Sequence, residues 1–243
     1  MIIKKFCAFF TIILFAAVLP VSHISCQQAN EMEWKDQRMK LVKSLEKKGI
    51  NNQAVLQAMR DVPRHLFVPE HQRPAAYEDH PLPIGYGQTI SQPYVVAYMC
   101  QALKLTGKEK VLEIGTGSGY HAAVLSLLCD SVYTIEIVPQ LGRSAEKLLD
   151  ELGYENIKVK IGDGYRGWTE YAPFDAIMLT AAPPEIPQPL IDQLAVGGRL
   201  LAPVGEDWQE LVLLEKTDAG ITRTNLLPVV FVPMTGEAEW QNK

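Results

Sequence analysis

Short apolar runs alternate with longer segments of helical periodicity through the central part of the chain. The runs contain few polar residues, which is typical of strands that are buried on both faces of a parallel sheet. We expect strands at Val111–Ile114, Val132–Ile137, Ile157–Ile161, Phe174–Leu179 and Arg199–Val204. The segments between them predict helices at Tyr120–Leu128, about Pro139–Leu152 and Gln188–Leu194. This alternation predicts an α/β fold with a doubly wound, mostly parallel sheet.

Helical segments precede this core, and a hairpin follows it. From Glu33 to Val62 apolar residues recur at helical spacing, and Gly49 divides the stretch into two helices. The segment from Tyr77 to Gln92 is dense in Pro and Gly, so we expect a long irregular loop, which is often functional. The remaining expected elements are a helix at Pro93–Leu105 and a terminal β-hairpin formed by Glu210–Lys216 and Ile221–Val232.

The length and composition suit one globular domain. The chain has 243 residues, of which 47% are apolar and 21% are charged, and this is ordinary for a domain with a substantial core. We expect the domain at residues 33–236, with a helical cap and active-site loop at 33–105 and a sheet core at 106–236. The net charge of −5 and the lack of a long Lys/Arg run argue against nucleic-acid binding. Scattered histidines without metal-ligand spacing argue against a metal site.

The N-terminus has the layout of an export signal. Lys4 and Lys5 precede an apolar run from Phe6 to Val21, and this order of charge and apolar residues is typical of secretory signals. We therefore expect a signal or anchor at residues 1–26 and membrane association through that segment alone. Cys26 lies in a loose match to a lipoprotein processing site, so a lipid anchor there is a weaker hypothesis. The alternatives are an uncleaved anchor and a mis-assigned start of the chain. Cell fractionation tests the export hypothesis, because mature protein found only in the cytoplasm would reject it.

Two cysteines lie in the body of the chain. Cys100 and Cys129 are surrounded by apolar helical sequence, where a free thiol usually behaves as a small core residue. The sequence leaves a disulfide between them open.

A glycine-rich turn follows the first predicted strand of the core. Gly115, Gly117 and Gly119 occupy alternate positions immediately before a predicted helix. A buried strand that runs into such a turn and a helix is how α/β folds build nucleotide sites, although the turn can also be purely structural. The spacing is one residue shorter than the dinucleotide G-x-G-x-x-G.

Two carboxylates follow the next two predicted strands. Glu136 lies 21 residues after Gly115, where an acidic side chain can accept hydrogen bonds from ribose hydroxyls, unless it is simply a solvated strand end. Asp163 stands between Gly162 and Gly164 at the end of the third strand, at the edge where open α/β sheets bind ligands. The short glycine spacing and the lack of a phosphate-binding Lys favour an adenosine cofactor without phosphate, namely S-adenosylmethionine.

Several motifs resemble those of the protein-L-isoaspartate O-methyltransferase family. They are LEIGTGSGY (Leu112–Tyr120), VYTIEI (Val132–Ile137), GDGY (Gly162–Tyr165), APFDAI (Ala172–Ile177), PLPIGYGQTISQPYVVA (Pro81–Ala97), GGRLLAPVG (Gly197–Gly205) and FVPMTG (Phe231–Gly236). The resemblance implies a Rossmann-like class I methyltransferase that transfers a methyl group from S-adenosylmethionine to the α-carboxylate of L-isoaspartyl, and by extension D-aspartyl, residues in damaged polypeptides. The family is usually cytoplasmic, so the export signal is unexpected.

The resemblance also assigns residues to roles. It makes Ser91, in QTIS, the active-site residue. It places Gly115, Gly117, Gly119, Glu136, Asp163 and Gly164 at cofactor positions, and we expect Gln88 and Thr89 to shape the loop over the cofactor.

The chemistry needs positioning rather than a strong base. A carboxylate is already ionised at neutral pH, so Ser91 is expected to orient it as a hydrogen-bond donor. No G-x-S-x-G elbow surrounds Ser91, which argues against a serine hydrolase. Ser91 could instead, or in addition, cap the helix that begins near Pro93.

An extended polypeptide is expected to pair with an exposed edge near Val230–Pro233, and the enzyme is expected to act as a monomer. The other hypotheses are a methyltransferase for another carboxylate or a small molecule, and a non-catalytic binding module.

Overall fold

The computed structural model describes residues 21–240, and these fall into two compact units that meet at residues 35 and 36. Helix α1 (Val21–Lys47) begins earlier than the sequence predicts and belongs to both units. The predicted export signal lies mostly outside the described residues, and so does the Cys26 side chain. Within residues 21–240, no helix is both long and apolar enough to cross a membrane.

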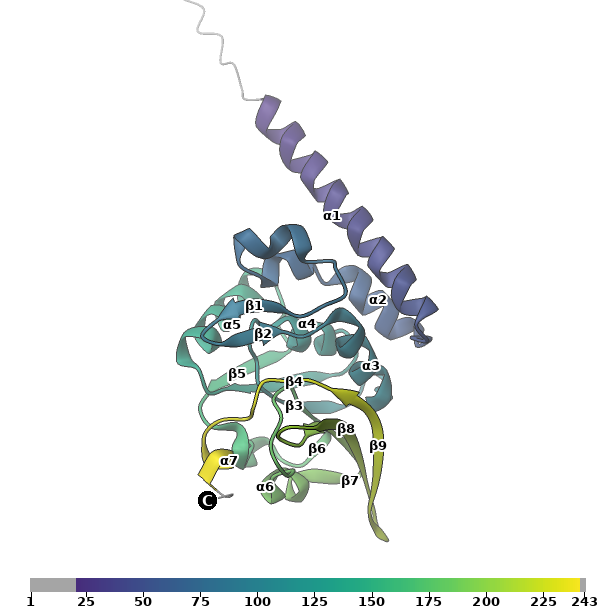
Figure 1. Ribbon diagram of the computed structural model, residues 1–243, viewed down its shortest axis with the longest axis vertical. Helices are drawn as coiled ribbons and strands as arrows, with labels where there is room; N and C mark the ends of the chain where they lie inside the picture. The colour runs from purple at the N-terminus through teal and green to yellow at the C-terminus, as the bar shows by residue number, and fades with distance from the viewer. Residues whose placement is uncertain (1–20, 241–243) are drawn as a thin grey trace, which may run out of the picture. The chain divides into compact units, whose positions relative to one another are not determined.

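The second unit is built on a seven-stranded sheet, whose strands carry their labels in Figure 1. Its strands are β3 (Lys110–Ile114), β4 (Ser131–Glu136), β5 (Ile157–Ile161), β6 (Phe174–Leu179), β7 (Leu194–Val204), β8 (Gln209–Thr217) and β9 (Gly220–Val229). The order across the sheet is β5-β4-β3-β6-β7-β8-β9, parallel from β5 to β7 and antiparallel for β8 and β9. The doubly wound sheet and the terminal hairpin are therefore confirmed.

Helices lie around this sheet, and several of them cover its apolar side chains. They are α2 (Gln53–Asp61), α3 (Pro93–Leu103), α4 (Tyr120–Ser126), α5 (Pro139–Glu151), α6 (Gln188–Asp192) and the terminal turn α7 (Glu237–Trp240). Helix α5 contacts β4 and β5, α4 contacts β4, and α3 contacts β7. The central positions Leu112, Ile177 and Leu200 are completely buried, which explains why these strands read as continuous apolar runs.

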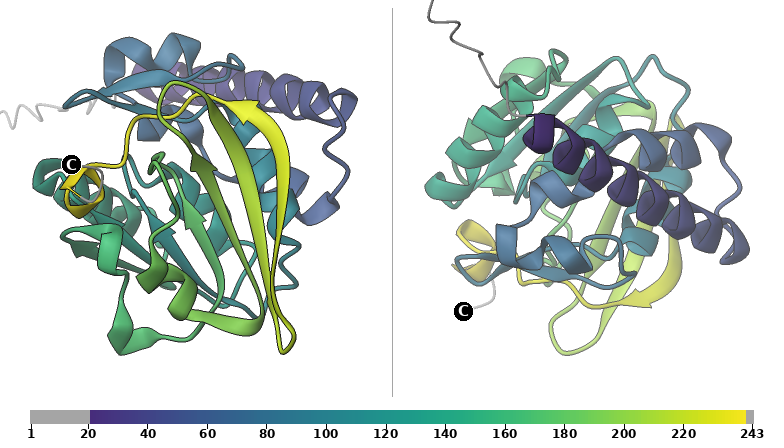
Figure 2. Two further views of the ribbon diagram at one scale, coloured as in Figure 1. Left: turned by 60° about the horizontal axis from the view of Figure 1, so that its bottom comes forward. Right: turned by 90° about the horizontal axis from the view of Figure 1, so that it is seen from above.

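The segment between Tyr77 and Gln92 is not wholly irregular, so that prediction was wrong in part. It contains a small antiparallel hairpin, β1 (Leu82–Gly85) and β2 (Gln88–Ile90), after short 3₁₀ turns at Arg64–Phe67 and Glu70–Ala75. Burial alternates along β1, but the Pro and Gly residues hid this strand pattern in the sequence. Strand β2 contributes lining residues to the same cavity as the glycine turn after β3. Figure 2 shows the hairpin beyond one end of the large sheet.

Cys100 and Cys129 are both free and buried. The disulfide that the sequence left open is therefore not formed, and each thiol fills space in the apolar interior. Burial raises the pKa of Cys129 to about 12, so this thiol stays protonated and unreactive at neutral pH.

Candidate active site

The site lies where the order of the sheet reverses. The chain adds β4 and β5 on one side of β3 and then crosses to β6 on the other side. The loops that follow β3 and β6 therefore diverge, which opens a crevice at the carboxyl edge of the sheet. A main-chain hydrogen bond of 2.9 Å from the Thr180 amide to the Ile114 carbonyl joins the two strand ends beneath this crevice.

The glycine turn adopts a conformation that other residues would resist. Gly115, Gly117 and Gly119 have φ values of +104°, +56° and +87°, all in the left-handed region that favours glycine. A Cβ at Gly115 would also overlap the Thr180 hydroxyl, which donates to the Gly115 carbonyl at 2.6 Å. Thr180 thus fixes the start of the turn. Its role was not predicted, because Thr180 follows a buried strand and belongs to no recognisable motif.

Glu136 holds the middle of the same turn. The residue is 5% exposed, and its carboxylate accepts hydrogen bonds from the Gly117 amide at 2.7 Å and the Val138 amide at 2.9 Å. Each oxygen is engaged by one donor, so each retains acceptor capacity. A pair of adjacent ribose hydroxyls needs two such acceptors.

Most of the predicted site residues line one pocket, which we call the inner pocket. The predicted residues that line it are Gln88, Thr89, Ser91, Gly115, Gly117, Glu136 and Gly164. Gly164 is required there, since a Cβ would overlap the Ile114 side chain.

Gly119 and Asp163 do not line the inner pocket. A Cβ at Gly119 would meet Leu149 and Ala145 of α5, so this glycine serves helix packing. The Asp163 carboxylate accepts from the Tyr165 amide at 2.9 Å and from the Glu237 amide at 2.8 Å. It thereby ties the C-terminal segment to the end of β5, and its direct contact with a cofactor stays a prediction.

The C-terminal segment forms one wall of the inner pocket, a role that was not predicted from the sequence. Val232, Pro233, Met234 and Thr235 all line the cavity. The segment is bound to the loop that follows β6, because the Met234 amide donates to the Ala182 carbonyl at 2.8 Å. The motif FVPMTG supported the family resemblance, and the neighbouring edge was expected to bind a polypeptide, but nothing in its sequence indicated that it lines the inner pocket.

Ser91 lies where the inner pocket meets a second cavity. This outer groove is lined by residues that include Thr89, Ser91, Tyr94, Trp208, Val230 and Val232. Ser91, Thr89, Thr180 and Val232 belong to both cavities. A group bound in one cavity can therefore meet a group bound in the other beside the Ser91 hydroxyl.

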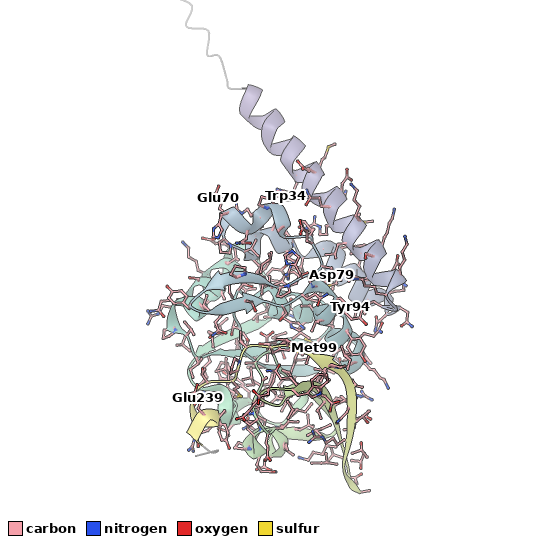
Figure 3. All side chains as sticks on the ribbon, viewed as in Figure 1. Trp34, Glu70, Asp79, Tyr94, Met99 and Glu239 are labelled. Atoms are coloured by element: carbon pink, nitrogen blue, oxygen red, sulfur yellow. The ribbon has the colours of Figure 1, made fainter. Side chains whose placement is uncertain are left out.

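Ser91 does not cap helix α3. The Tyr94 amide in the first turn of α3 instead donates to Asp79 at 2.8 Å, and Figure 3 shows these two residues close together. Gln92 occupies the cap position without a side-chain hydrogen bond. Among the described residues the Ser91 hydroxyl has no hydrogen-bond partner, which leaves it available to a ligand.

Buried polar groups lie beneath the glycine turn. Glu113 is completely buried and accepts from Thr134 at 2.6 Å, and Thr134 is 2.7 Å from the Thr116 hydroxyl in the turn. Burial, reinforced by the nearby charge of Glu136, raises the pKa of Glu113 to about 8, so it is mostly neutral at pH 7. Burial lowers the pKa of His121, which lines the inner pocket, to about 3, so this imidazole is also neutral.

The charge of the inner pocket discriminates among ligands. Among the described residues that line it, Glu136 is the only one that is charged at neutral pH, and no Lys or Arg is present. Phosphate groups would find no cationic partner there. A positively charged adenosine compound suits both the ribose acceptors and the net negative charge, so the residues present fit S-adenosylmethionine.

Comparisons with known proteins agree with this geometry. Residues 36–239 match the family model described as protein-L-isoaspartate(D-aspartate) O-methyltransferase. A protein-L-isoaspartate O-methyltransferase from Gloeobacter violaceus is 58% identical over 79% of this chain and 95% of its own length. One from Picosynechococcus is 55% identical over 79% of this chain and 86% of its own length.

Solved structures agree as well. A protein-L-isoaspartate O-methyltransferase superposes with a TM-score of 0.76 at 30% identity, over 83% of this chain and 67% of its own. A Plasmodium falciparum enzyme of the same name, solved with S-adenosyl-L-homocysteine, gives a TM-score of 0.72 at 27% identity, over 81% of this chain and 97% of its own. The sheet, the site and these matches together show that the chain belongs to the protein-L-isoaspartate(D-aspartate) O-methyltransferase family.

Proposed function

We propose that this chain methylates the free α-carboxylate of L-isoaspartyl residues in damaged polypeptides beside the Ser91 hydroxyl. Its family membership makes it an S-adenosylmethionine-dependent carboxyl methyltransferase of protein repair. The observation that carries the residue-level proposal is the position of Ser91 on both the inner pocket and the outer groove.

The protein's part in the reaction is to position and shield the reactants. When bound, S-adenosylmethionine supplies a methyl group activated by a positively charged sulfur. The isoaspartyl carboxylate is ionised at pH 7, so no residue has to remove a proton. Ser91 donates a hydrogen bond that holds one carboxylate oxygen in line for transfer, and such alignment accounts for a large part of the rate in reactions of this kind.

Glu136 and the C-terminal segment serve the inner pocket. The Glu136 carboxylate accepts the ribose hydroxyls and holds the glycine turn through the Gly117 amide. Val232 to Thr235 close one side and limit the access of water. D-aspartyl residues are a second substrate class under this proposal, since they too present a displaced carboxylate.

The outer groove is where we place the polypeptide. Val230 is 96% exposed, and its main-chain amide and carbonyl have no hydrogen-bond partner among the described residues. An extended peptide can pair with this free edge as an added strand. An open groove with a free main-chain edge favours a polypeptide over the small-molecule alternative, and Ser91 and Glu136 are both present, which disfavours a non-catalytic module.

Label transfer tests the proposed function. Two peptides that differ only in an isoaspartyl or a normal aspartyl linkage would be incubated with methyl-labelled S-adenosylmethionine. We expect base-labile label on the isoaspartyl peptide alone, because a carboxyl methyl ester is readily hydrolysed. Equal labelling of both peptides, or of neither, would reject the substrate assignment.

A further inference from the structure

We infer that the outer groove selects isoaspartyl sites that are flanked by a basic side chain, which Asp207 and Trp208 bind. The inference rests on the proposed function, because it assumes that the polypeptide occupies this groove. It concerns the loop between β7 and β8, which none of the family motifs includes beyond Gly205.

The loop is held firmly against the sheet at one end. Gly205 has a φ of +124°, and a Cβ there would overlap the Trp208 carbonyl. The Gly205 amide also donates to the Pro183 carbonyl at 3.0 Å. Only glycine therefore permits a turn this tight, and the turn sets where Asp207 and Trp208 project.

The other end of the loop is joined to the free edge of the groove. The Gln209 side chain donates to the Phe231 carbonyl at 3.1 Å and accepts from the Phe231 amide at 2.7 Å. These two hydrogen bonds resemble those between paired strands, and they hold the residue after Trp208 against the segment that contains Val230, so both residues line the same groove. A peptide paired with that edge would present its side chains to the loop.

The Trp208 ring remains exposed despite these restraints. Trp208 is 71% exposed, although it lines the groove. A large aromatic ring that is fixed at its backbone and left open to solvent offers its face to a partner. Tryptophan provides the best face for a cation among the natural side chains.

The charge of the groove points to the same partner. Among the described residues that line it, Asp207 is the only one with a charged side chain. Lys48, which lies 5.9 Å from the centre of the Tyr94 ring, is paired with Asp79 and does not line the groove. A Lys or Arg near the isoaspartyl residue would gain an ion pair with Asp207 and a contact with Trp208, whereas a Glu would be repelled.

The expected effect is moderate, because both groups are exposed. An exposed ion pair together with an exposed cation–π contact corresponds to a preference of roughly three- to tenfold. Because peptide binding changes and the chemical step does not, the preference should appear in KM rather than in kcat. It should also weaken at high salt.

The test uses isoaspartyl peptides with Lys, Gln or Glu placed in turn at the two positions before and the two positions after the isoaspartyl residue. We expect the Lys peptide to have a KM roughly three- to tenfold lower than the Glu peptide at one position or more. The variants Asp207→Asn and Trp208→Ala should each reduce this ratio. Glu206→Gln is the matched control, since it removes the same charge from an adjacent exposed residue that does not line the groove, and it should keep the preference.

The outcomes separate this inference from the proposed function. If no peptide is methylated, the proposed function fails. If all are methylated with equal KM, or if Asp207→Asn and Trp208→Ala keep the full preference, the inference is wrong and the function stands. A loss of preference in Glu206→Gln equal to that in Asp207→Asn would also overturn it, because the effect would then be one of net charge.

Discussion

Glu113 is a buried, protonated carboxyl group beneath the glycine turn of the site. Its carboxyl is completely buried in β3, and one of its oxygens has no hydrogen-bond partner among the described residues. A buried carboxylate without full hydrogen bonding is costly, so the proton is retained. The hydrogen bond from Thr134 and its contact with Thr116 connect this neutral carboxyl to the glycine turn.

The raised pKa of Glu113 predicts a specific dependence of stability on pH. Burial raises this pKa from 4.5 to about 8, so between these values the folded protein holds a proton that the unfolded chain has lost. The free energy of unfolding should therefore fall as pH rises through that window, by at most about 1.4 kcal/mol per pH unit. Glu113→Gln is neutral at every pH and should lack this fall, as urea unfolding of both proteins from pH 5 to pH 9 would measure.

Comparing the wild type with Glu113→Gln separates the effect of Glu113 from that of other titratable groups. Burial lowers the pKa of His65 to about 4 and that of His121 to about 3. Each histidine therefore destabilises the folded protein only as pH falls below the ordinary histidine pKa. They act equally on the wild type and on Glu113→Gln. Parallel stability curves for the two proteins across the window would show that Glu113 is ionised in the folded state.

Single residues also show the limit of motif reasoning. The glycine spacing predicted the position of the turn, because a turn of this kind needs glycine locally. The hydrogen bond between Glu136 and the Gly117 amide was not predicted, and the contact of Glu136 with a ribose stays a prediction. The cofactor contacts expected of Asp163 and Gly119 stay predictions, and the structure adds a contact of Asp163 with the Glu237 amide and of Gly119 with α5. Those partners come from distant parts of the chain, so local sequence could not reveal them.

The elements around the site were predictable where their pattern was regular. Buried parallel strands give uninterrupted apolar runs, so the sheet core could be derived from the sequence. The β1–β2 hairpin could not, because Pro and Gly interrupt its alternation and its left-handed turn includes Tyr86 with a φ of +54°. The wall formed by Val232 to Thr235 was equally hidden, since its position depends on pairing with Ala182.

The unpaired main chain after β9 predicts how a proline at Val230 changes peptide binding. Val230→Pro removes a main-chain donor that has no partner within the described part of the chain, so the fold loses no hydrogen bond. If a peptide pairs with this edge, KM for isoaspartyl peptides should rise roughly tenfold, the equivalent of one lost hydrogen bond, while the affinity for S-adenosylmethionine is unchanged. Steady-state kinetics and calorimetry would measure the two quantities.

Val230→Ala serves as the matched control for this edge. It removes the exposed side chain but keeps the main-chain amide, so its KM should stay close to that of the wild type. An unchanged KM in Val230→Pro, or an equal rise in Val230→Ala, would rule out main-chain pairing at this position.

At the scale of the molecule, the fold brings two cavities to one serine. The switch in strand order opens the inner pocket, and the hairpin, α3 and the C-terminal segment border the outer groove. Under the proposed function, the methyl donor and the acceptor enter from different sides and meet at Ser91, which lines both cavities. Asp79 caps α3 from outside and so leaves the Ser91 hydroxyl to the substrate.

The most direct test of this account compares Ser91→Ala with Glu136→Gln, measuring both kcat on an isoaspartyl peptide and the Kd of S-adenosylmethionine. Ser91→Ala should lose roughly 10- to 100-fold in kcat, the equivalent of a hydrogen bond to a charged group, with an unchanged Kd. Glu136→Gln should raise Kd roughly tenfold or more, because one acceptor becomes a donor, and should keep most of kcat at saturating S-adenosylmethionine. A Ser91→Ala enzyme with normal turnover, or one whose defect lies in Kd, would contradict the placement of methyl transfer at the junction of the two cavities.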